Sequence, residues 1–300
     1  MAGQRRGCRM LEFARWITER DYRAALMAAG LVLLPLLAPA SCAVLALVAL
    51  QRGAGSAWLA GGIAAALLAV VAAVSGAHPV AGVLSAVTIW APTLAVTQLL
   101  ISTGSLSAAA RVATTGAVVL AGGWSLLAPT QGEPWVGLVT EMVAPLAAQT
   151  GTDAGLMAER LLALLPGIIA ASLLLVSLGG MFIAMWLRAG LAQPGAFGEA
   201  FRALQLGPVV GGVGALATIG VLAGGQAVAG AVALPLGAAL LLQGIAVMHA
   251  LVRLKGMHRA WLFAGWTALV FLSPWALVGF AFYGMADTFM DLRRKAAGKV

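Results

Sequence analysis

The chain carries little charge and few of the residues that soluble enzymes use. Charged residues make up 9% of its 300 residues, against about a quarter in typical soluble proteins. There are only two cysteines, Cys8 in a basic tail and Cys42 in an apolar segment, which support neither a disulfide framework nor a metal site. The three histidines form no HExxH motif, and no phosphate-binding loop of the P-loop type is present. We therefore expect no catalytic residues, no cofactor and no bound metal.

Apolar residues make up most of the chain. They make up 62% of the chain and form runs of 18 or more along its whole length, and such runs predict transmembrane helices. The net charge of +8 is not a signal for nucleic acid, because the basic residues flank the apolar runs and no basic stripe carries interleaved aromatic residues. The sequence predicts an all-α, polytopic transmembrane helical bundle surrounded by membrane lipids, with one integral membrane domain over residues 24–292.

Six apolar segments have the length of a full crossing. They are Trp58–Gly76, Val80–Ser102, Ala108–Ala128, Leu161–Leu187, Gly207–Ala223 and Val228–Val252. Two further segments, Ala24–Leu50 and Trp261–Met290, are interrupted by proline near their middle. As one helix, the 30 residues of the second would reach about 45 Å, against a hydrocarbon core of about 30 Å. Each of these two segments is therefore either one long crossing or two short helices that enter and return.

The positions of lysine and arginine separate these two topologies. If each proline-broken segment crosses once and the N-terminus is inside, nearly every basic loop falls outside, which inverts the positive-inside rule. If each forms a helical pair, 17 of the 18 basic residues fall on the cytoplasmic side and only Arg160 falls outside. We predict about six full spans plus a short helical pair at each end, eight to ten helices in all. Both termini are then cytoplasmic, and the expected location is the bacterial inner membrane.

The segments outside the spans differ in charge. Residues 1–23 are basic, with apolar residues on one helical face, so an amphipathic helix on the cytoplasmic leaflet and an ordinary basic flank both fit. The external loop, residues 130–160, holds the external acidic residues. The cytoplasmic loop, residues 189–206, places Phe197 and Phe201 on one helical face, which suits either a partner protein or the lipid interface. Residues 293–300 form a basic cytoplasmic tail.

Neutral polar and aromatic residues gather near the predicted outer ends of the spans, where several prolines interrupt the helices. Broken helices expose backbone polar groups, which are tolerated only where they face protein or a water-filled cavity. This end of the spans therefore predicts an outward pocket, and turn residues at the interface are the alternative. The candidate pocket residues are Ser75, His78, Trp124, Gln131, Trp135, Gln226 and Trp275. Gln243, deeper in its span, is expected to be a buried amide bonded to a neighbouring helix.

A second set of residues is a candidate for docking partner proteins on the cytoplasmic side. Ala24 and Ala28 form a small-xxx-small pair of the kind that lets two helices approach closely. Charges near the C-terminus are expected either to pair with a partner or to form a solvated helix end. The full docking set is Ala24, Ala28, Phe197, Phe201, Asp287, Asp291 and Arg294.

Several segments resemble a bacterial membrane protein family. They are Leu241–His249 (LLQGIAVMH), Gly284–Asp287 (GMAD) with Asp291–Arg294 (DLRR), and Gln193–Phe201 (QPGAFGEAF). Together with Leu45–Gly53 (LALVALQRG), they resemble the family known as domain of unknown function 2232, or YybS-like membrane proteins. At the fold level that family is similar to the substrate-capture subunits of energy-coupling-factor vitamin transporters and to the rod-shape protein MreD.

The resemblance implies two possible functions. A capture subunit binds a small solute in an outward pocket and needs a coupling membrane subunit and ATPases for energy. An MreD-like protein instead organises envelope or cell-wall proteins and needs no pocket. We take the solute-binding subunit as the leading hypothesis and the scaffold as its rival, and no enzymatic activity is expected of either.

The topology is testable with reporter fusions. A reporter fused after Val300 or inserted at Gly256 is expected to be active in the cytoplasm, and one at Gly132 in the periplasm, because this arrangement keeps the basic loops inside. Alkaline phosphatase and a fluorescent protein at the same three positions give opposite readouts and control for expression. A periplasmic signal at Gly256 contradicts the helical-pair topology.

Overall fold

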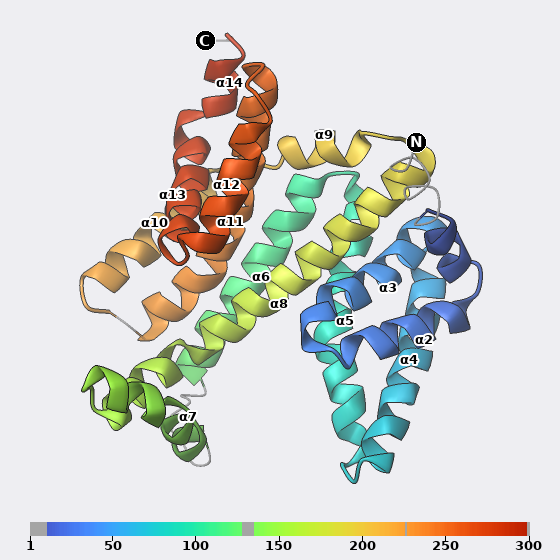
Figure 1. Cartoon of the computed structure of the whole chain (residues 1–300), viewed down its shortest axis with the longest axis horizontal. Coiled ribbons are helices and arrows are strands. Elements are labelled where there is room, and N and C mark those ends of the chain that lie inside the picture. The colour runs from blue at the N-terminus through green and yellow to red at the C-terminus, as the bar shows by residue number, and fades with distance from the viewer. Residues whose placement is uncertain (1–10, 128–134, 226, 299–300) are drawn as a thin grey trace. The chain divides into compact units, whose positions relative to one another are not determined.

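The computed structural model of the chain describes residues 11–127, 135–225 and 227–298. All regular elements in these ranges are helices (Figure 1). Residues 11–18 are helical. The elements that follow are α2 (Asp21–Val32), the 3-10 helix η1 (Pro35–Leu37), α3 (Ala38–Arg52), α4 (Ala54–Val74), α5 (Pro79–Thr103), α6 (Leu106–Leu127), α7 (Trp135–Thr150), α8 (Ala154–Ala192), α9 (Ala196–Arg202), α10 (Gly207–Leu222), α11 (Ala227–Leu254), α12 (Ala260–Phe271), α13 (Trp275–Met290) and α14 (Leu292–Ala296).

The all-α prediction is confirmed, and the chain is a polytopic membrane protein. Five helices, α4, α5, α6, α8 and α11, are long and apolar enough to cross a membrane, and a sixth candidate joins α9 with α10. These helices correspond to the six predicted spans. There are more helices than the eight to ten expected, because the loop and tail segments form the helices α7, α9 and α14 of their own.

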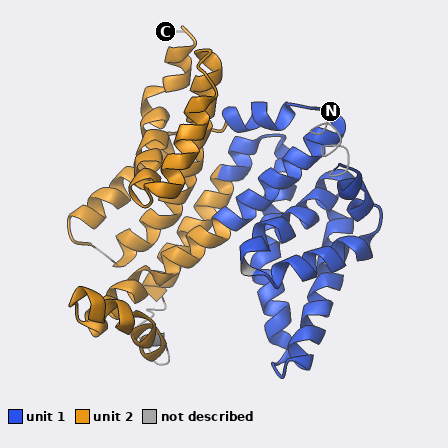
Figure 2. Cartoon of the chain, viewed as in Figure 1, with its two compact units in different colours: residues 1–110, 175–203 blue, residues 111–174, 204–300 orange. Residues whose placement is uncertain are grey.

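The chain forms two compact units (Figure 2). Unit 1 comprises residues 1–110 and 175–203, and unit 2 comprises residues 111–174 and 204–300. Helices α6 and α8 each contribute residues to both units. Each unit has its own packed interior and is described by itself below.

In unit 1 the first proline-broken segment folds as an antiparallel helical pair, α2 and α3. Arg52 at the end of α3 forms an ion pair with Asp21 at the start of α2, with 2.7 Å between Nη1 and Oδ1. Further along the pair, the Ser41 hydroxyl donates to the Ala28 carbonyl oxygen at 2.7 Å. These contacts join the first residues of one helix to the last residues of the other, so the predicted helical pair at this end is confirmed.

Helix α3 is the buried centre of unit 1. All ten residues from Ser41 to Leu50 are buried, which is the pattern of a helix that is apolar on every side and enclosed by others. Its 15 residues span about 22 Å, less than the hydrocarbon core. A short helix is accommodated here because α2, α4 and α5 surround it and supply its contacts.

In unit 2, α11 and α13 pack against each other over an extensive contact. Gly244 of α11 and Gly284 of α13 lie at the crossing. A Cβ atom on Gly244 would overlap the Phe280 carbonyl oxygen, and one on Gly284 would overlap the Leu240 carbonyl oxygen. The two helices approach this closely because both positions lack a side chain. Helix α10 packs on the same pair and forms a hairpin with α11.

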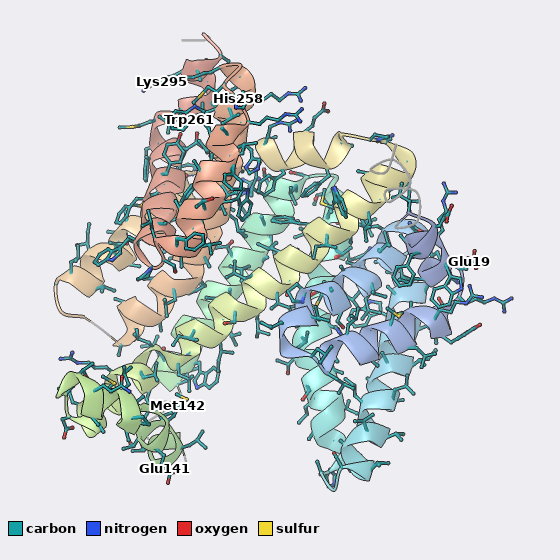
Figure 3. The ribbon with its side chains drawn as sticks, in the orientation of Figure 1. Glu19, Glu141, Met142, His258, Trp261 and Lys295 are labelled. Atoms are coloured by element: carbon teal, nitrogen blue, oxygen red, sulfur yellow. The ribbon has the colours of Figure 1, made fainter. Side chains whose placement is uncertain are left out.

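The second proline-broken segment forms α12 and α13, separated at Ser273-Pro274, where the peptide bond is cis. Figure 3 shows His258 and Trp261, at the start of α12, at the same end of unit 2 as Lys295, which follows α13. The chain therefore runs down α12 and returns along α13. The predicted helical pair at the C-terminal end is confirmed.

The external loop of the sequence contains a helix that packs on the start of α8. Val139 and Val143 of α7 are buried against Ala158 and Leu162 of α8. Glu141 lies on the opposite side of α7 from this contact and is exposed, as the side chains drawn in Figure 3 show. This segment is thus an ordered helical hairpin in its described residues.

The close α11–α13 crossing predicts that one added methyl group lowers the stability of unit 2. Gly244→Ala is expected to lower the free energy of unfolding by about 1–3 kcal/mol, because the added Cβ has only backbone atoms to displace. Gly237→Ala is the matched control on the same helix, since nothing lies within 4 Å of a Cβ there. Unfolding in a mild detergent by added SDS measures both variants. Equal stability of the two would show that the close crossing does not hold unit 2 together.

Candidate functional site

Ser75 and His78, from the predicted outward pocket, lie in the turn between α4 and α5 in unit 1. The Ser75 hydroxyl donates to the Ala72 carbonyl oxygen at 2.9 Å, and His78 Nδ1 accepts from the Val80 amide at 3.3 Å. His78 is the N-cap of α5. Both residues are exposed. Their contacts are those of turn and cap residues, and nothing in unit 1 converges on them.

The other predicted pocket residues are dispersed. Trp124 is half-buried in α6 and Trp275 is 81% exposed at the start of α13, and both belong to unit 2. Gln131 and Gln226 lie outside the described residues, as does the side chain of Trp135. The described members of the set thus do not form a single site within either unit.

The predicted docking residues of unit 1 are used for packing within that unit. Ala24 and Ala28 are fully buried in the interior that α2, α3 and α4 share. Phe197 and Phe201 of α9 both contact Phe182 of α8, with ring centroids 6.1 Å and 5.5 Å away. The face that these two residues share, which the sequence predicts, therefore holds α9 against its own unit.

Gln243 organises the polar interior of unit 2. Its side chain is completely buried, and its Oε1 accepts from the Leu206 amide at 2.9 Å. Its Nε2 lies 3.0 Å from the Gly284 carbonyl oxygen, 3.0 Å from Thr288 Oγ1 and 3.1 Å from Asp287 Oδ2. The expectation that Gln243 is a buried amide bonded to a neighbouring helix is confirmed. This one side chain links α11, α13 and the segment before α10.

Asp287, expected at a cytoplasmic docking surface, is instead buried. Its side chain is inaccessible and forms an ion pair with Arg293 at 2.6 Å, and the Arg293 guanidinium also donates to the Leu204 carbonyl oxygen at 3.0 Å. Asp291 accepts from the Arg294 amide as the N-cap of α14. A buried carboxylate needs such a partner, because an unpaired charge in the interior is costly. These contacts close the end of unit 2 and serve packing within it.

A polar contact also links helices in unit 1. The Trp90 indole of α5 donates to the Ser41 hydroxyl of α3 at 2.9 Å, and that hydroxyl in turn donates to Ala28 of α2. All three residues are buried. In both units the buried polar side chains described here are thus engaged with neighbouring helices, which is the ordinary way to satisfy polar groups in hydrocarbon.

A cavity of about 570 Å³ lies in unit 1 where α3, α5 and α8 end. Its walls come from the last turns of α3 and α5, the final residues of α8, and the adjoining face of α9. Most of the lining is apolar, including Leu50, Leu100, Met185 and Phe197. Its volume lies in the usual range of small-molecule pockets, about 300–1,000 Å³.

Two polar side chains line this cavity, Arg188 of α8 and Gln193 beyond its end. Arg188 has no hydrogen-bond or ion-pair partner among the residues that the structure describes. Arg52, close in sequence to the lining residue Leu50, is paired with Asp21, and Arg293 in unit 2 is paired with Asp287. Sequence reasoning did not single out Arg188, because one arginine at the end of a span is what the positive-inside rule expects anyway.

A second cavity of about 440 Å³ adjoins the first, sharing Ala189 and Phe197 with it. It lies around the last turn of α8, and its lining includes Leu11 and Trp186 but no charged side chain. Leu11 also approaches Gly190, so the helical segment 11–18 packs against the end of α8. The α8–α9 corner thus carries one cavity with a positive charge and one that is uncharged.

In the described ranges no group of three or more histidine, cysteine or acidic side chains is placed to hold a metal ion. No protein-family model, curated protein or solved structure matches the chain. The cavity with Arg188 is therefore the candidate site, on its geometry alone.

The Asp287–Arg293 pair predicts a large loss of stability when one partner is removed. Arg293→Met or Asp287→Leu is expected to cost about 2–3 kcal/mol, below the roughly 3–5 kcal/mol typical of a fully buried pair because the Arg293 side chain is 10% exposed. Removing both is expected to restore part of the loss, since no unpaired charge remains buried. SDS unfolding of the three variants measures this cycle.

The matched control is the more exposed pair in unit 1. Its side chains are 34% and 22% accessible, so Asp21→Asn is expected to cost only about 0.2–1 kcal/mol. A similar cost for both pairs would contradict a structural role for Asp287.

Proposed function

We propose that this chain is a membrane-embedded binding subunit that holds a small ligand in the cavity where α3, α5 and α8 end, and that works with partner proteins. The observation that carries this proposal is the Arg188 guanidinium, which is exposed at a cavity of about 570 Å³ and has no partner among the described residues. A convergent charge in a mostly apolar pocket is the usual design of a ligand site. The buried polar side chains described above are instead engaged in contacts with neighbouring segments of their own unit.

The proposed site lies at the cytoplasmic end of the spans. The charge distribution assigns the loops after Arg52, around Gly104 and after Arg188 to the inside of the bacterial inner membrane, with both termini on that side. A capture subunit of the energy-coupling-factor type takes its solute from outside. We propose that this chain instead receives its ligand from the cytoplasm or the inner leaflet, and that any coupling subunit and ATPases act from that side.

We propose no enzymatic role. A catalytic site needs a nucleophile or an acid–base pair in reach of its substrate, and the lining of this cavity offers only Arg188 and Gln193 as polar side chains. These two groups are suited to binding a ligand and not to catalysing a reaction.

The scaffold function is the second candidate, and the exposure of α12 favours it. Within α12, which the structure describes in full, no side chain is buried. Trp261, Phe263 and Phe271 are 60–79% exposed. Lipid or a partner protein must cover such a helix in the membrane, so an envelope protein organised by this surface is the rival to a ligand-binding role.

Purification in mild detergent from the native membrane, with mass spectrometry of proteins and small molecules, separates the two functions. The wild type is expected to retain a small molecule, and Ala192→Phe, which fills the cavity, to lose at least about nine-tenths of it. Ala95→Phe is the matched control, on an exposed face of α5 outside the cavity lining.

Recovery of cell-wall or division proteins with all three forms, and no small molecule with any, would replace the binding function by the scaffold. Equal retention by the wild type and Ala192→Phe would place any ligand elsewhere on the chain.

A further inference from the structure

We infer that the ligand of this cavity is an anionic phospholipid of the cytoplasmic leaflet, with its phosphate on the Arg188 guanidinium and its acyl chains along the apolar walls. This inference rests on the proposed binding function and names the chemical class of its ligand. Three features support it: a guanidinium with no partner among the described residues, two adjoining apolar cavities, and the proposed position of both cavities near the membrane interface.

The charge of Arg188 is exposed at the cavity and suits an anion. Arg188 presents a planar group with five N–H donors, and no described residue accepts from it. A guanidinium binds phosphate through two parallel hydrogen bonds, a geometry that an ammonium group does not offer. Gln193, on the same wall, adds an amide that is able to donate to a second phosphate oxygen.

The helix ends around the cavity disfavour an anion, but more weakly than Arg188 favours one. Helices α3 and α5 end at the glycine caps Gly53 and Gly104, both of which line the cavity. The carboxyl end of a helix carries a partial negative charge of about one half, which disfavours an anion there. Part of that charge is already used, because each cap amide bonds the carbonyl of the last turn. A full positive charge in direct contact with phosphate outweighs these more distant partial charges.

The walls favour a lipid over a soluble anion. The rest of the main cavity's lining is mostly alanine, glycine and larger apolar side chains, which offer nothing to a hydrated phosphate. The adjoining cavity, lined by Leu11, Trp186 and Leu187 among others, has no charged group. Two apolar spaces that share Ala189 and Phe197 beside one cation fit a molecule with a charged head and long hydrocarbon chains.

The position of the site agrees with this class of ligand. Trp186, which lines the second cavity, is 48% exposed, and tryptophan is enriched at the level of the lipid headgroups. The charge distribution places this end of the spans on the cytoplasmic side, where anionic lipids concentrate and basic pockets between membrane helices bind their headgroups.

The test uses the full-length chain in nanodiscs that contain equal parts of phosphatidylglycerol and phosphatidylcholine, with bound lipid counted by native mass spectrometry after release. The wild type is expected to retain phosphatidylglycerol in preference. Arg188→Gln is expected to reduce that retention about tenfold, the worth of one charge-assisted hydrogen bond, and Arg188→Lys to reduce it less. Arg253→Gln is the control, because it removes the same charge from an exposed position outside the cavity lining.

Thermal unfolding midpoints equal to that of the wild type establish that the variants are folded. Equal retention of the two lipids by the wild type, or displacement of phosphatidylglycerol by millimolar inorganic phosphate, would overturn the inference of a lipid ligand.

The two proposals fail in different ways. A small molecule that Ala192→Phe removes and Arg188→Gln leaves in place would overturn the lipid inference and preserve the binding function. If neither variant loses lipid or any other ligand, the proposed binding function of this cavity is overturned.

Discussion

Hydrocarbon offers no hydrogen-bond partner to the backbone, and this constraint shapes every element of the chain. Each peptide group in the membrane must be satisfied within its own helix or by a neighbouring part of the protein. Long spans such as α5 and α11 meet the requirement alone. A short helix meets it only when other helices surround it. Helix α3, with 15 residues, is enclosed by α2, α4 and α5. The constraint thus explains both the helical fold of the described residues and the enclosed position of the short helix α3.

The same constraint governs side chains, and it decides where polar residues lie. In unit 1 the Trp90 indole donates to the Ser41 hydroxyl, which itself donates to the Ala28 carbonyl oxygen. In unit 2, Gln243 satisfies the Leu206 amide and bonds α13, while the neighbouring Asp287 neutralises Arg293. Such groups fix which helix faces meet, because any other arrangement leaves a donor or an acceptor unpaired. Helices also approach one another closely where side chains are absent, as at the glycines of the α11–α13 crossing.

Arg188 stands apart from this pattern, and the difference carries the functional argument. Arg52 and Arg293 have carboxylate partners within their units, whereas Arg188, like Arg253 and Arg259, is exposed and has no ion-pair partner among the described residues. Arg188 faces a cavity with apolar walls and has no partner among the described residues. A charge that packing leaves unused, beside space that packing leaves unfilled, is the combination a ligand exploits. Arg188 lies near the end of α8, a helix long and apolar enough to cross a membrane.

The sequence by itself determined the helical class, the main spans and the helical pair at each end, because apolar runs, prolines and chain length act locally. It also favoured a buried, bonded amide at Gln243, since an amide at that depth in a span commonly bonds a neighbouring helix. Only the tertiary structure decided that Ala24, Phe197 and Asp287 pack within the chain, and that the cavity forms beside Arg188. The packing of these residues and the cavity both depend on which helices become neighbours. Residues that are distant in sequence together determine that helix arrangement.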